Sequence, residues 1–147
     1  MKRVKLLILS ISLLTCGLGT IYGIIFYQLP NTPMFSYWNV AGYDPGDPII
    51  LTKGEDKEMY IAAIAPFDIK KFNVKANIVF SGIQIEFPID YKLEILDTPI
   101  PEGTELQCRI NFPVLESFPS TDGMLVLTFY GQEGKVIAGG AATFSIR

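Results

Sequence analysis

The N-terminal part of the chain contains one continuous uncharged segment, residues 6–27, that is long enough to cross a membrane. As an α-helix its 22 residues would span roughly 33 Å, against about 30 Å for the hydrocarbon core of a bilayer. The only charges before it are Lys2, Arg3 and Lys5, and the next charged residue is Asp44. Because positive charge marks the cytoplasmic side, we expect the N-terminus to be cytoplasmic. The sequence thus predicts a cytoplasmic tip (1–5), a single transmembrane helix acting as a signal anchor (6–27), a linker (28–33) and an extracytoplasmic domain (34–147).

Two other fates of this segment stay open. A cleaved signal peptide would use residues 6–14 as its apolar region, with Gly17 and Gly19 as the small residues before the cleavage site. The run Leu13-Leu14-Thr15-Cys16 resembles a bacterial lipobox, although Thr15 stands where Gly, Ala or Ser is usual. That resemblance implies a surface lipoprotein acylated at Cys16. The mostly apolar residues that follow Cys16 favour the uncleaved anchor in the cell membrane.

Small residues recur along one face of the expected helix. Ser12, Cys16, Gly19 and Gly23 are spaced so that they share this face, and the two glycines have the G-x-x-x-G spacing. Glycine at such positions lets two helix backbones approach closely. The stripe therefore predicts packing against a second membrane helix, which belongs either to an integral membrane protein partner or to another copy of this chain.

From residue 31 onward, apolar and polar residues alternate in short runs that turn residues separate. The clearest runs are 74–80, 83–87 and 106–112. Alternation with a period of two places one face of a strand in a core and the other in water, as in antiparallel sheets. Within this pattern, Pro88 indicates an edge position or a crossing between two sheets, and Gly139-Gly140 indicates a bulge.

The whole domain follows the same pattern. Seven or eight strands fit into about 115 residues, and no convincing amphipathic helix interrupts them. This is typical of an all-β fold, an antiparallel β-sandwich with Greek-key connections. The final stretch, from Thr121-Asp122-Gly123 through the hairpin loop 131–134 to the C-terminus, resembles the closing hairpin of immunoglobulin-like domains. The resemblance implies an immunoglobulin-like sandwich and no particular function.

Composition excludes several classes of function. The chain has no histidine, which removes Ser-His-Asp and Cys-His catalysis and histidine-containing metal sites. A net charge of −3 without a basic patch argues against nucleic-acid binding. Asp97-Thr98-Pro99 resembles the Asp-Thr-Gly motif of aspartic proteases, but proline replaces the glycine and a simple turn is the better interpretation. We therefore expect no enzymatic activity and no cofactor.

Two further groups of residues are weighed as sites. Cys108 lies on the apolar face of its run and is expected to fill the core, with Arg109 on the opposite face. The acidic residues of two loops could hold calcium weakly, although turn formation and solubility explain them better; they are Asp44, Asp47, Glu55 and Asp56.

The densest aromatic stretch follows the expected linker and has two interpretations. It is either a first core strand or a collar at the membrane interface that docks another membrane subunit; its residues are Met34, Phe35, Tyr37, Trp38 and Tyr43. With the short linker and the helix stripe, it predicts a non-catalytic, membrane-anchored, extracytoplasmic binding module, an accessory or assembly subunit of a larger membrane complex. The alternative is a surface lipoprotein or an adhesion-type sandwich that binds protein or carbohydrate.

Overall fold

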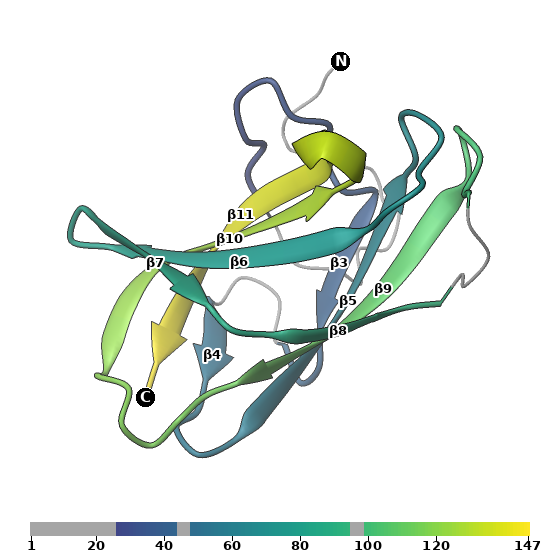
Figure 1. The fold of residues 1–147 in the computed structure, drawn as a ribbon. Helices are drawn as coiled ribbons and strands as arrows, with labels where there is room; N and C mark the ends of the chain where they lie inside the picture. The colour runs from purple at the N-terminus through teal and green to yellow at the C-terminus, as the bar shows by residue number, and fades with distance from the viewer. Residues whose placement is uncertain (1–25, 44–47, 95–98) are drawn as a thin grey trace, which may run out of the picture.

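The computed structural model describes residues 26–43, 48–94 and 99–147, which form two sheets that lie face to face (Figure 1). The first sheet has five strands in the order β4 (Ile49–Leu51), β11 (Val136–Ile146), β10 (Thr121–Tyr130), β6 (Asn73–Phe80) and β7 (Ile83–Phe87). The second has four strands in the order β3 (Tyr37–Val40), β5 (Asp56–Ile64), β9 (Glu105–Pro113) and β8 (Asp90–Leu93). A short 3-10 helix, η1 (Gln132–Gly134), lies between β10 and β11.

The prediction of an all-β sandwich is confirmed. Alternation along β9 buries Leu106, Cys108, Ile110 and Phe112 between the sheets and leaves the intervening residues facing outward. Among the strands that the structure describes, all pairings are antiparallel except that of β4 with β11, which is parallel through Ile49 to Leu51. The sandwich is therefore mixed in direction at that edge, where the sequence predicts antiparallel strands alone.

Pro88 marks a crossing between the sheets, as the sequence predicts. It follows β7, an edge strand of the five-stranded sheet, and precedes β8, an edge strand of the four-stranded sheet. Proline has no backbone N–H for a ladder, so the position between two sheets leaves no hydrogen bond unmade.

The expected bulge at Gly139-Gly140 is wrong in its position. The irregularity in the register between β10 and β11 lies instead between two other pairs, Phe129 with Ala138 and Tyr130 with Val136. The glycines instead permit close approach of the N-terminal residues. A Cβ on Gly139 would lie 2.8 Å from Leu29 Cδ1, and one on Gly140 would lie 3.0 Å from Phe26 Cδ2.

These N-terminal residues, 26–34, form a strap along β11. The Tyr27 N–H donates to Ala141 O at 2.7 Å, the Ala141 N–H donates to Tyr27 O at 3.0 Å, and the Gly139 N–H donates to Pro33 O at 2.9 Å. The sequence predicts Phe26 and Tyr27 at the end of the membrane helix and residues 28–33 as a linker, but these residues pack along the sandwich. Among the described residues, packing against the sandwich already begins at Phe26, ahead of the expected start at Met34. Apolar residues suit both places, so hydropathy alone could not separate them.

Residues 6–25, the remainder of the expected span, lie outside the described residues. Within the described ranges, no helix has the length and hydropathy that a membrane span requires.

A larger side chain at Gly140 should loosen the strap. In Gly140→Val the new atoms would press on Phe26 and Phe35, since even a Cβ would lie 3.2 Å from Phe35 Cδ2. We expect the free energy of unfolding to fall by about 1–3 kcal/mol, the usual cost of overpacking. Amide exchange at Tyr27 and Ala141 should accelerate. Thr143→Val, an exposed position on the same strand, is the control; unchanged exchange in Gly140→Val would show that the strap does not depend on the glycine.

Candidate functional site

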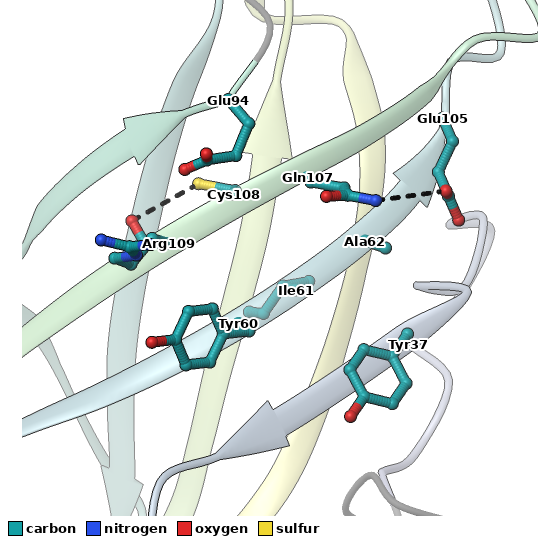
Figure 2. Close-up of a pocket in the computed structure, with 9 residues that line it drawn as sticks. All are labelled: Tyr37, Tyr60, Ile61, Ala62, Glu94, Glu105, Gln107, Cys108 and Arg109. Atoms are coloured by element: carbon teal, nitrogen blue, oxygen red, sulfur yellow. Dashed lines mark hydrogen bonds between the residues drawn. The ribbon is translucent and has the colours of Figure 1, made fainter.

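The candidate site is a shallow concavity of about 400 Å³ on the outer face of the four-stranded sheet (Figure 2). We call it the outer-face site. Residues of β3, β5 and β9 contribute most of its lining, together with Glu94 just after β8. The lining residues are Tyr37, Tyr60, Ile61, Ala62, Glu94, Glu105, Gln107, Cys108 and Arg109.

Strand register brings two tyrosines to this site. Tyr37 pairs with Ala62 and Asn39 pairs with Tyr60, so the two tyrosines are diagonal neighbours on one face. They remain 37% and 38% exposed. Ala62 lies on the same face of the sheet and is buried. Because its side chain is a single methyl group, it does not fill the concavity above it. The site thus offers two aromatic rings beside a small apolar floor.

Arg109 and Gln107 supply the polar groups on the next strand. Arg109 pairs with Tyr60, and its guanidinium lies 5.4 Å from the centre of the Tyr60 ring. Its Nε is 3.6 Å from Glu58 Oε2, in an ion pair whose side chains are about half exposed. Exposed ion pairs of this kind are weak, so Arg109 can exchange Glu58 for a ligand at small cost. Gln107 Nε2 donates to Glu105 Oε1 at 3.5 Å (Figure 2).

Both tyrosine hydroxyls at the site are uncharged at neutral pH. A hydrogen bond with Glu58, followed by desolvation, raises the pKa of Tyr60 above its usual value. Desolvation raises the pKa of Tyr37. Both hydroxyls therefore keep their protons at neutral pH and can donate as well as accept hydrogen bonds.

The arrangement is suited to non-covalent binding. Two exposed rings, one charged donor, one side-chain amide and two carboxylates converge on one shallow surface, which is the chemistry of recognition sites. The described residues contain no group of three or more His, Cys, Asp or Glu that could hold a metal ion. Of the acidic loop residues, Asp44 and Asp47 lie outside the described residues, and Glu55 and Asp56 are exposed. Asp56 Oδ2 accepts a hydrogen bond from Asn111 Nδ2 at 3.0 Å.

The structure separates the aromatic stretch expected near the membrane. Phe35 and Trp38 are core residues, 3% and 0% exposed, so they cannot form a docking surface. Tyr43 is partly buried against the same core. Met34 and Tyr37 keep about a third of their surface exposed, and Tyr37 joins the outer-face site. For these two, a docking role stays a prediction, as does helix packing by Ser12, Cys16, Gly19 and Gly23, which lie outside the described residues.

Sequence reasoning missed Tyr60, Gln107 and Arg109 as site residues. The expectation that Arg109 faces away from the core is confirmed. Tyr60, however, belongs to a run that is apolar on both faces, so its outward direction carries no signal in the sequence. The three residues meet only through the register of β5 against β9.

Comparison with known proteins shows the fold. No protein-family description matches the sequence, and no curated protein matches it either. Among solved structures, a Niemann-Pick type C2 protein from Japanese carpenter ant is similar with a TM-score of 0.68 at 16% identity. The likeness covers 84% of this chain and 99% of that chain. AvmM, described as catalysing macrocyclization in alchivemycin A biosynthesis, has a TM-score of only 0.40 at 10% identity over 84% of this chain and 96% of its own. The first likeness supports the β-sandwich architecture, and the second is too distant to support any inference.

Proposed function

We propose that this protein is a non-catalytic binding module, held at the outer surface of a membrane by its N-terminal residues, and an accessory or assembly subunit of a larger membrane complex. The outer-face site carries the binding part of the proposal. Tyr37 and Tyr60 present apolar rings with polar tips there, and Arg109 stands beside them in a weak, exchangeable ion pair. Tyrosine and arginine are enriched where proteins contact one another.

The strap supports close attachment to a membrane. Residues 28–33 lie along β11 and cannot serve as a flexible tether, because the strap is hydrogen-bonded at both Tyr27 and Pro33. Residues 6–25 are uncharged and number about as many as a transmembrane helix needs. With such a helix joined directly to the strap, the domain would have little freedom to move away from the bilayer. A domain held in this way suits a partner in the same membrane, where confinement raises the effective concentration.

Carbohydrate binding is a second candidate for the same site. Two tyrosine rings could stack on the apolar faces of sugar rings, and Gln107 and Arg109 could bond hydroxyl groups. This candidate requires binding to a free oligosaccharide, without any protein partner.

Paired variants on the two sheets test the proposal. Tyr60→Ala with Arg109→Ala removes a ring and the cation above it. Tyr130→Ala with Lys75→Ala removes a matching pair from the five-stranded sheet, where Lys75 Nζ lies 5.8 Å from the Tyr130 ring centre. Each variant is cross-linked in native membranes and purified in mild detergent. We expect the first variant to recover at least tenfold less of the membrane protein partner than the native protein does. The second should keep it.

Equal recovery of the partner in both variants would remove the outer-face site from the proposal. If the purified protein instead binds a soluble oligosaccharide, and the Tyr60 and Arg109 variant does not, the carbohydrate candidate replaces the accessory subunit.

A further inference from the structure

Strand β7 is an exposed apolar edge. It closes one side of the five-stranded sheet and pairs only with β6 among the described strands. Four of its five residues are exposed, and two of these are large and apolar, Ile83 at 52% and Ile85 at 48%. Apolar side chains of this edge strand are therefore exposed to solvent, although a sandwich of this kind normally buries such surface.

The β6–β7 hairpin projects beyond the core. Ile78 pairs with Ile85 and Phe80 pairs with Ile83, so each pair shares one face of the sheet. Ile78 is buried, but its neighbour Ile85 is 48% exposed. Figure 1 shows this hairpin extending past the other strands at the left. Its turn has positive φ at Ser81 (48°) and Gly82 (75°), which is the conformation of a tight two-residue hairpin.

The edge carries little of the usual protection against strand pairing. Natural edge strands are commonly very short or carry lysine, proline or a bulge. The other edge strands have three or four residues, whereas β7 has five, with a regular register and Glu86 as its one charge. Pro88 lies beyond the strand and does not interrupt it.

We propose that β7 is an interface at which two copies of this chain pair, antiparallel and centred on Ile85. In this register Ile85 faces Ile85 of the partner subunit, Ile83 faces Phe87 of the partner subunit, and Gln84 faces Glu86 of the partner subunit. All five residues are paired, and an amide stands opposite each carboxylate. Shifting the centre to Glu86 would set two carboxylates face to face, and shifting it to Gln84 would leave residues unpaired. The sequence of β7 is thus self-complementary in one register.

Such pairing would be weak in solution and stronger on a membrane. A strand of five residues buries less surface than a standard stable interface, and confinement to a bilayer raises the effective concentration. The pairing uses neither the outer-face site nor the helix stripe, and its register does not depend on the proposed function; only its strengthening on a membrane does.

Cysteine cross-linking of the full chain in detergent, at a protein concentration high enough to populate a weak dimer, tests the register. In a Cys16→Ser background the remaining native thiol, Cys108, is buried. Ile85→Cys would bring two Cβ atoms to about 4.5–5.5 Å across the two-fold axis, within reach of a disulfide after small adjustment. Ile83→Cys is the matched control, since it is equally exposed but would lie about 13 Å from its own copy along the strand.

Under mild oxidation we expect most of the Ile85→Cys protein to become a covalent dimer and the Ile83→Cys protein to do so at least tenfold more slowly. Association through the N-terminal segment would not favour position 85 over position 83. Equal rates at the two positions, or no dimer at either, would overturn the pairing and leave the edge to a strand from another protein.

Discussion

Trp38→Ala should lower the free energy of unfolding by about 3–5 kcal/mol, the usual cost of removing a large buried aromatic side chain. Trp38 is fully buried, with ring centres of Phe26 and Phe35 at 5.8 and 5.7 Å. It therefore joins the four-stranded sheet to the strap, and its removal should loosen both. Urea unfolding of the full chain in detergent, followed by circular dichroism, measures the change without relying on the fluorescence of the chain's one tryptophan.

Trp38→Phe should cost less than half as much as Trp38→Ala. The indole Nε1 is buried and has no hydrogen-bond partner in the part of the chain that the structure describes. A buried donor without a partner costs about 1–3 kcal/mol, and phenylalanine removes that donor while keeping most of the apolar contact. An equal loss of stability in the two variants would contradict this reasoning and would indicate that Nε1 has found a partner.

The strands that the sequence predicts well are those whose pattern is local. Runs 74–80, 83–87 and 106–112 correspond to β6, β7 and β9 within a residue at either end. A period of two identifies the buried face from each strand alone, whatever the strand pairs with. The crossing at Pro88 follows in the same way, because proline limits its own position in a sheet.

What the sequence does not reveal depends on contacts between distant residues. The parallel pairing of β4 with β11 and the strap along β11 join segments about a hundred residues apart. An apolar side chain such as that of Phe26 suits both the end of a membrane helix and contact with Gly140, so hydropathy cannot distinguish these two places. The close approach itself explains the two glycines, and it appears only once the strap is in place.

The candidate site can be predicted only in part, because it too depends on contacts between distant residues. The aromatic residues from Met34 to Tyr43 are contiguous in sequence, which suggested one surface. Alternation along β3 instead sends Trp38 inward and Tyr37 outward. Tyr60 and Arg109 meet Tyr37 only because β5 pairs with both β3 and β9, a fact of register that no single strand contains.

Cys108→Asp should lower the free energy of unfolding by at least about 3–5 kcal/mol, as much as Trp38→Ala or more, or should prevent folding. Cys108 is 2% exposed, on the inner face of β9 opposite Ile61, as the sequence predicts. An unpaired carboxylate there would lose its hydration without gaining a cation, because the neighbouring core residues are apolar. Cys108→Ala keeps the site apolar and should cost only about 1–2 kcal/mol. A difference of less than 1 kcal/mol between the two variants would contradict the burial of this position.

The thiol itself reports the same burial through pH. Burial raises the pKa of Cys108 from its ordinary value of 9.0 to about 12. Because the folded state holds the proton more tightly than the unfolded state, the contribution of this thiol to stability is complete below about pH 9 and falls as the pH rises toward 12. Tyrosines and lysines titrate in the same range, so the decisive quantity is the difference in free energy of unfolding between the native protein and Cys108→Ala. This difference should become smaller as the pH rises across this interval.

In a Cys16→Ser background, maleimide should label Cys108 at neutral pH only after unfolding, since labelling requires an accessible thiolate. Rapid labelling of the folded protein would mean that the inner face of β9 opens to solvent, and the sandwich could then no longer be treated as a closed core with recognition confined to its surface.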